Sequence, residues 1–171
     1  MGPSYASTWI EEQKLFCSFL TGGVDLLTVN RWKENMDQEA LAIPRGMHFR
    51  SLFSLEGYQP LDVEVHKAMR QTIPYFLSRF NFYAGYLRLF PEVRVPLKST
   101  GGSQCDRVAH VHNDQGKMQE YQRRFGRDNE QFFTTNRAAF DWILQPDHGT
   151  TELRGDSSLH EKLFNSIFGE G

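Results

Sequence analysis

The sequence contains few cysteines, no long hydrophobic run and no excess of charge of either sign. Its 171 residues include two cysteines, Cys17 and Cys105, whereas a structural zinc site needs about four ligands. No apolar run approaches the roughly 18 residues of a membrane-spanning helix. The 19 Lys and Arg residues are balanced by 21 Asp and Glu residues, which excludes a strongly basic nucleic-acid-binding protein.

The beginning of the sequence lacks the pattern of a targeting segment. No Lys or Arg precedes Lys14, while Glu11 and Glu12 come early. A secretory signal needs a positive start followed by an apolar stretch, and a transit peptide is rich in Arg and poor in acidic residues. The low cysteine content also favours a reducing compartment. We therefore expect an intracellular protein, located in the cytoplasm or inside an organelle.

Aromatic residues are what the sequence has in excess. They make up 13% of the chain, and Phe alone occurs 14 times. A chain of this length buries on the order of 70% of its unfolded surface, so it needs neither a disulfide nor a metal to fold. We therefore predict a single domain over residues 1–171.

The segment from Thr8 to Thr21 is predicted to be a helix with a wide apolar face. Thr8 and Glu11 have the spacing of a capping box, and Gly22 with Gly23 supplies a stop. At about 100° per residue, the apolar side chains cover an arc of roughly 220°. A surface helix buries only about half that width.

A second predicted helix, from Tyr75 to Phe90, is apolar and aromatic over about 180° of its circumference. Arg79 falls inside this arc, so it must pair, extend to the surface or contact a partner. Because aromatic residues and Arg anchor protein interfaces, we predict that this segment binds another protein. The interface candidates are Arg79, Tyr75, Phe82, Tyr83, Tyr86 and Phe90.

These patterns predict a mainly α fold, an irregular multi-helix bundle of about six helices. Further helices are expected over residues 25–42, 60–73, 117–125, 135–144 and 157–168. Alternating valines at 93 and 95, and a second alternating run at 108–114, predict a short β-hairpin near residues 92–114. The domain would then have an N-terminal helical part (8–90), a hairpin or loop (91–116) and a C-terminal helical part (117–169).

One cluster of residues has the composition of a metal site. His110, His112 and Asp114 occupy alternate positions, which a strand would place on one face. Two His and one carboxylate are a ligand set for zinc or non-haem iron with open positions. The alternative function is therefore a metal-dependent hydrolase or oxygenase; the polar outer face of a hairpin is the simpler interpretation.

A second alternative rests on basic residues beside aromatic ones. Arg123, Arg124 and Arg127 lie near Tyr121 and Phe125, a combination that holds single-stranded nucleic acid by phosphate pairing and base stacking. This would suit an RNA-associated coat or nucleocapsid-type protein. Acidic residues in the same run reduce its net charge, as is ordinary for a solvated helix.

No motif is specific enough to assign a family. Phosphate-binding Gly patterns and nucleophile elbows are missing from the sequence. We therefore expect a non-enzymatic structural protein without a cofactor, a small subunit or assembly factor that binds other protein subunits or itself through aromatic-rich helix faces.

Overall fold

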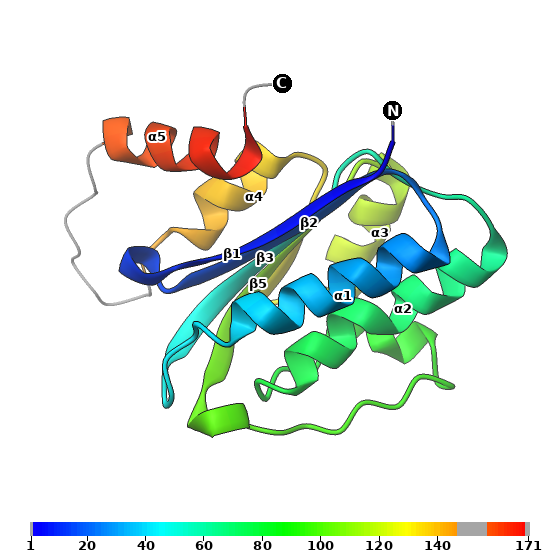
Figure 1. Ribbon diagram of the computed structural model, residues 1–171, viewed down its shortest axis with the longest axis horizontal. Helices are drawn as coiled ribbons and strands as arrows, with labels where there is room; N and C mark the ends of the chain where they lie inside the picture. Colours follow the sequence, from blue (N-terminus) through cyan, green and yellow to red (C-terminus); the bar gives the residue numbers. More distant parts are fainter. Residues whose placement is uncertain (1, 147–156, 170–171) are drawn as a thin grey trace.

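The computed structural model describes residues 2–146 and 157–169 and has an α/β fold. Within these residues a six-stranded mixed sheet has the order β1-β2-β3-β5-β6, and the short β4 pairs with β2 (Figure 1). The strands are β1 (Ser4–Ile10), β2 (Leu15–Val24), β3 (His48–Leu55), β4 (Tyr58–Pro60), β5 (Gln104–His112) and β6 (Glu130–Phe133). The prediction of a mainly α bundle is therefore wrong.

Five α-helices accompany the sheet in the described residues: α1 (Leu26–Ala40), α2 (Val63–Ser78), α3 (Gln115–Phe125), α4 (Asn136–Ile143) and α5 (Ser157–Phe168). Short 3-10 turns occur at Glu11–Gln13, Gly85–Leu89 and Thr100–Gly102. Helices α1 and α2 lie on one side of the sheet, and α4 with α5 lies on the other (Figure 1). The side chains of Asp25, Asp62, Asp114 and Thr135 cap the helices that follow them.

The predicted helix from Thr8 to Thr21 is instead the antiparallel pair β1 and β2. Thr8 lies opposite Cys17, and Lys14 turns the chain in a left-handed conformation (φ 49°). Along β2, Phe16 and Leu20 enter the core under α1 and α2, while Leu15 and Cys17 enter the core under α4. Because both faces of β2 are buried, the sequence shows a continuous apolar run rather than alternation, and on a wheel such a run resembles a wide helical face.

The hairpin predicted near residues 92–114 is also wrong. Residues 93–97 form no strand, while β5 lies between β3 and β6 and is parallel to both. Likewise, the predicted helix from Tyr75 to Phe90 ends early, because α2 stops at Ser78 and the chain continues through a loop into the turn Gly85–Leu89. The aromatic residues of this segment fill space between elements rather than one helix face.

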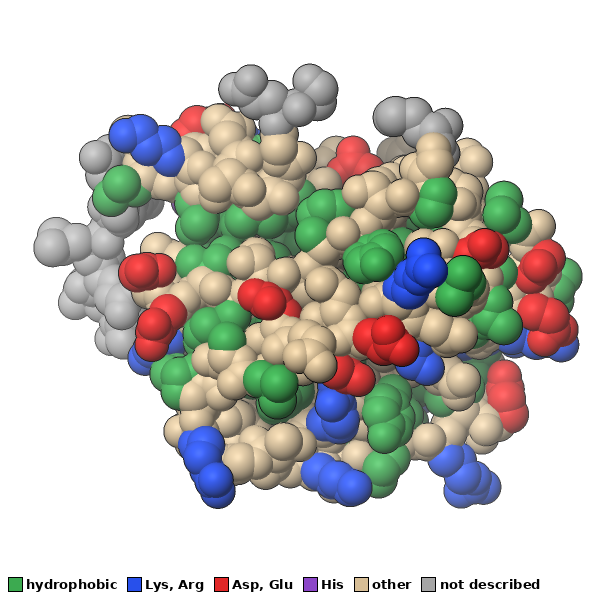
Figure 2. All heavy atoms as spheres, viewed as in Figure 1, with side chains coloured by type: hydrophobic (Ala, Val, Ile, Leu, Met, Phe, Trp, Pro, Cys, Tyr) green, Lys and Arg blue, Asp and Glu red, His purple; other side chains and the backbone are tan. Residues whose placement is uncertain are grey.

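The core has two main parts, one on each side of the sheet. Trp32 of α1 and Phe76 of α2 are buried against one face, and Phe140 of α4 is buried against the other. Hydrophobic side chains are visible along the seam between α5 and the β1 edge (Figure 2), where Leu163 and Ile167 pack. None of the helices in the described part of the chain is long and apolar enough to cross a membrane.

Candidate functional site

A cavity of about 530 Å³ lies between α2 and α3, and we name it the α2–α3 pocket. Its lining includes Leu55 and His112, the last residues of β3 and β5, so it is at the carboxyl ends of two adjacent parallel strands. This edge is where open α/β sheets bind their ligands, because the loops that follow the strands leave a crevice there.

Two helices supply Arg70 and Lys117, the Arg and Lys side chains of the pocket lining. On α2, His66, Met69, Arg70 and Ile73 recur at intervals of three and four residues and therefore share one face. On α3, Lys117, Met118 and Tyr121 follow the same rule. Each helix thus presents one permanently charged side chain, Arg70 or Lys117, beside apolar ones such as Met69 and Met118.

The cationic side chains of the pocket repel one another. Burial lowers the pKa of Lys117, and nearby Arg70 adds to this effect while Asp114 opposes it. Burial followed by the charge of Lys117 lowers the pKa of His112 and also that of His66. The site therefore gathers positive charge at a partly desolvated position, which disfavours protonation of both imidazoles.

Two polar atoms of the pocket lack a hydrogen-bond partner among the described residues. The Tyr58 hydroxyl is one, on a side chain that is only 6% exposed, and burial raises its pKa to about 12. The Arg70 Nε is the other, although this guanidinium lies 3.7 Å from Glu92 and stacks on Phe90. Buried polar groups usually have partners, so each of these atoms would gain a missing hydrogen bond if a ligand or water came within reach of it.

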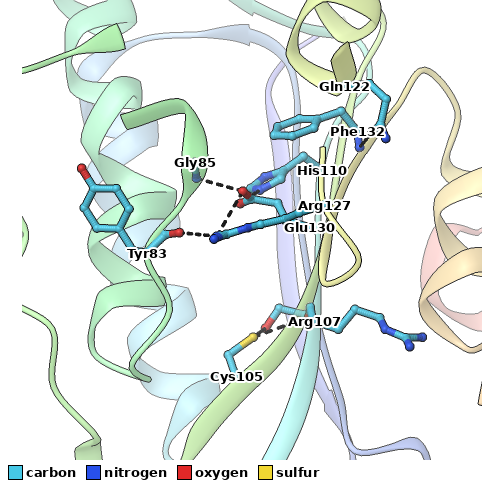
Figure 3. Close-up of polar contacts among 10 residues, drawn as sticks. Tyr83, Gly85, Cys105, Arg107, His110, Gln122, Arg127, Glu130 and Phe132 are labelled. Atoms are coloured by element: carbon cyan, nitrogen blue, oxygen red, sulfur yellow. Dashed lines mark hydrogen bonds and ion pairs between the residues drawn. The ribbon is translucent and has the colours of Figure 1, made fainter. Parts of the chain in front are cut away.

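At the inner end of the pocket, His110 is held by a buried carboxylate (Figure 3). Its Nε2 lies 3.0 Å from Glu130 Oε2, and the backbone N–H of Gly85 donates to Glu130 Oε1 at 2.8 Å. Arg127 is 3.4 Å from the same Oε1 and also donates to the backbone carbonyl of Tyr83. A side chain at position 85 would place its Cβ 3.0 Å from Glu130 Oε1, so glycine is what permits this close approach.

Aromatic rings surround His110. Its imidazole stacks on Phe132 at 4.8 Å and meets the edge of Tyr86 at 5.3 Å. Tyr86 in turn stacks on Tyr121 at 5.7 Å. Burial, and then the charge of Glu130, raises the pKa of Tyr86, so its hydroxyl stays protonated. This end of the pocket is therefore aromatic, whereas the end near Lys117 is cationic.

The predicted metal ligands occupy three different positions. His110 pairs with Glu130, and His112 Nδ1 accepts a hydrogen bond from the Asp114 backbone N–H. The Asp114 carboxylate accepts from the Lys117 backbone N–H and caps α3. Among the described residues, no group of three or more His, Cys, Asp or Glu side chains is placed to hold a metal ion. The zinc or iron alternative stays a prediction.

The predicted interface residues divide between the interior and the surface. Tyr75 (49% exposed) and Tyr83 (42% exposed) lie at the surface, whereas Phe82 is buried. Tyr86 and Phe90 line the α2–α3 pocket. Arg79 pairs with Asp37 and stacks on Phe76. That these residues bind another protein stays a prediction.

The predicted nucleic-acid residues have intramolecular partners. Arg123 pairs with Glu120 at 2.6 Å. Arg124 is 3.9 Å from Glu120 and lies over the Phe125 ring. Arg127 joins the Glu130 network described above. RNA binding therefore also stays a prediction.

Several residues of the pocket were not predicted from the sequence. The three- and four-residue spacing of His66, Met69, Arg70 and Ile73 could have indicated a shared helix face with two polar members. Glu130 gives no such signal, because its contacts come from segments distant in sequence.

The comparisons with known proteins assign no function. No protein-family model matches the sequence, and no curated protein matches it. Among solved structures, the chain is similar to an uncharacterized protein of the DUF3478 family with a SpoIIAA-like fold from Shewanella loihica PV-4. The two are 12% identical with a TM-score of 0.44, and the similarity covers 83% of this chain and 94% of the other.

Proposed function

We propose that this protein binds a small organic anion in the α2–α3 pocket. The observation that carries the proposal is the convergence of Arg70, Lys117, His66 and His112 on one cavity of about 530 Å³, where burial, and then neighbouring positive charge, lowers the pKa of Lys117, His66 and His112. Holding like charges together costs free energy that a bound anion offsets.

One acidic residue of the pocket lining, Asp114, and one beside it, Glu92, offset only part of this charge. Asp114 is engaged at the start of α3, where it accepts the Lys117 backbone N–H at 3.0 Å. Glu92 is 3.7 Å from Arg70, and its side chain is 61% exposed, so solvent screens the pair. Positive charge therefore predominates inside, and the unpartnered Tyr58 hydroxyl adds a neutral donor.

The rest of the lining favours an organic ligand over an inorganic ion. Met69, Ile73, Met118 and Phe132 contribute apolar surface to the cavity. Sites for small organic molecules enclose about 300–1,000 Å³ and combine apolar walls with a few convergent polar groups. An inorganic phosphate would leave most of these walls in contact with water only.

Titration calorimetry on the full chain tests the proposal with two pairs of probes. Each pair holds the body constant and changes the charge: hexanoate against 1-hexanol, and 3-phenylpropionate against 3-phenyl-1-propanol. We expect at least one acid to bind about tenfold more tightly than its alcohol, as charge-assisted hydrogen bonds suggest. Equal affinities within both pairs, or no binding by either acid at millimolar concentration, contradict the proposal.

A matched pair of variants locates the site. Lys117→Gln removes a pocket cation and should weaken binding of the acid about tenfold. Lys67→Gln removes a cation of α2 outside the pocket lining, whose side chain is 57% exposed and whose Nζ lies 3.5 Å from Glu64, and should leave the affinity unchanged. The same loss in both variants would indicate a general charge effect rather than this site.

A further inference from the structure

The α2–α3 pocket has two chemically different ends at a fixed separation. His112 stands at the cationic end, where Lys117 and His66 influence its pKa. His110 stands at the aromatic end, against Phe132 and Tyr86. Both histidines belong to β5 and are two positions apart, which is about 6.6 Å along the strand at a rise of about 3.3 Å per residue, and Lys117 Nζ lies 5.5 Å from the centre of the Tyr121 ring.

The aromatic end is suited to a flat ring. Tyr86, Tyr121 and Phe132 form a set of stacked and edge-on contacts, with ring centroids 5.6 to 6.2 Å apart. A further ring that meets these faces and edges gains attraction beyond the burial of its area. A saturated chain or ring of the same size gains only the free energy of burying its apolar surface.

The cationic end is suited to a single negative charge with a hydrogen-bond acceptor. Arg70 and Lys117 are opposed there by Asp114, which leaves about one net positive charge while the histidines are neutral. The Tyr58 ring stands on the same side, since its centroid is 6.4 Å from that of the His112 ring in an edge-on contact, and its hydroxyl lacks a partner among the residues described.

We propose that the ligand is an aromatic carboxylate of the arylpropionate type, with its ring near Tyr86 and Phe132 and its carboxylate near Lys117 and Tyr58. The 5.5 Å between Lys117 Nζ and the centre of the Tyr121 ring, together with the spacing of the two histidines along β5, suits a ring and a carboxylate joined by two methylenes. This inference rests on the proposed function and specifies the class of anion.

Three further probes separate this inference from the proposed function. Against 3-phenylpropionate, 3-cyclohexylpropionate keeps the charge and loses the aromatic ring, whereas 2-phenylethyl phosphate keeps the ring and changes the head group. The third, benzoate, shortens the distance between ring and charge. We expect 3-phenylpropionate to bind about three- to tenfold more tightly than the cyclohexyl acid, and more tightly than the phosphate and benzoate.

Each outcome has a distinct meaning. Equal affinities for the two propionates would show that the ligand need not be aromatic. Tighter binding of the phosphate would overturn the carboxylate head group, and tighter binding of benzoate would overturn the proposed spacing. None of these three outcomes contradicts anion binding itself. If neither propionate binds better than 3-phenyl-1-propanol, the inference fails, and if hexanoate likewise binds no better than 1-hexanol, the proposed function fails with it.

Two substitutions test the two ends of the pocket separately. Tyr58→Phe deletes a hydroxyl that has no partner among the described residues, so the unfolding temperature without ligand should stay equal or rise. The affinity for 3-phenylpropionate should nevertheless fall several-fold, and unchanged affinity would remove Tyr58 from the site.

Tyr121→Leu should reduce the ratio of the affinities for the phenyl and the cyclohexyl acid towards unity. An unchanged ratio would overturn the placement of the ring.

Discussion

Glu130 Oε2 lies 3.0 Å from His110 Nε2, and both side chains are buried, at 0% and 6% exposure. The pair joins two parallel neighbours, β6 and β5, and through Gly85 it also holds the segment that carries Tyr86. Buried charged groups are tolerated when every polar atom is satisfied, and this carboxylate has contacts at both oxygens (Figure 3). The Glu130 network therefore shapes the aromatic end of the α2–α3 pocket.

Glu130→Ala should lower the free energy of unfolding by about 3 kcal/mol, because it leaves the Gly85 N–H and the His110 ring without their buried partner. Glu130→Gln should cost less, since its amide oxygen still accepts from Gly85. Urea denaturation measures both. Glu120→Ala is the control, because Glu120 pairs with Arg123 at the surface of α3. A loss no larger than that of the control would contradict the role of Glu130.

Gly85→Ala should destabilise the fold by about 1–3 kcal/mol through overpacking. Its new Cβ would lie 3.0 Å from Glu130 Oε1 and 3.2 Å from Phe125 Cβ, so the carboxylate or the turn must shift. The comparison is Gly116→Ala in α3, where the nearest atom would be 3.7 Å away and alanine favours the helix. Thermal unfolding of the two variants should give shifts of opposite sign; equal shifts would show that the contact at position 85 is easily relieved.

The stability of the free protein should fall as the pH drops below about 6.5, the ordinary pKa of histidine. His66 and His112 have lowered pKa values in the folded chain, so the unfolded chain binds more protons in this range. Their contribution is present above the unfolded pKa and is lost as the pH falls toward the folded pKa. Urea midpoints between pH 7.5 and 5.5 measure the slope, which the double variant His66→Gln/His112→Gln should make shallower. An unchanged slope would mean that other titratable groups determine how stability depends on pH.

Anion binding should depend on pH in the opposite direction from stability and become stronger as the pH falls. A carboxylate near His66 and His112 stabilises their protonated forms and raises their pKa, so binding takes up protons. The affinity for 3-phenylpropionate should therefore increase as the pH falls from 8 to 6, while the acid remains ionised. Calorimetry in buffers of different ionisation enthalpy counts the protons taken up. Affinity that is independent of pH, with no proton uptake, would place the anion away from both imidazoles.

Local signals predicted most of the helices but not the sheet. The predicted ranges 117–125 and 135–144 agree closely with α3 and α4, because caps and stops act within a few residues. The strands β2 and β3 were missed, since Leu15, Phe16 and Phe53 all point into apolar surroundings on one or the other face of the sheet. Where both faces are covered, the alternation that identifies a strand disappears.

The strand that carries the two histidines was predicted, whereas the sites proposed from the sequence remain predictions. The alternation of residues 110–112 indicates a strand with both histidines on one face, and both line the α2–α3 pocket. The pairing of His110 with Glu130 spans 20 residues, and that of Gly85 with Glu130 spans 45. Contacts of this separation leave no periodic trace in a sequence, so Glu130 and Gly85 could not be distinguished from other acidic and glycine residues.

The sequence by itself determined where most of the helices lie, because helix caps and apolar spacing are local properties of the chain, but it assigned a helix to Thr8–Thr21, which forms a pair of strands. It also determined an excess of aromatic side chains that needed cover. Only the tertiary structure decided what covers them. It placed Tyr86 and Phe132 beside His110, and it brought α2 and α3 together over the ends of β3 and β5, where Arg70 and Lys117 converge. The order of the strands and the packing of the helices on the sheet depend on the apolar surface buried by the whole chain, and no single segment carries that information.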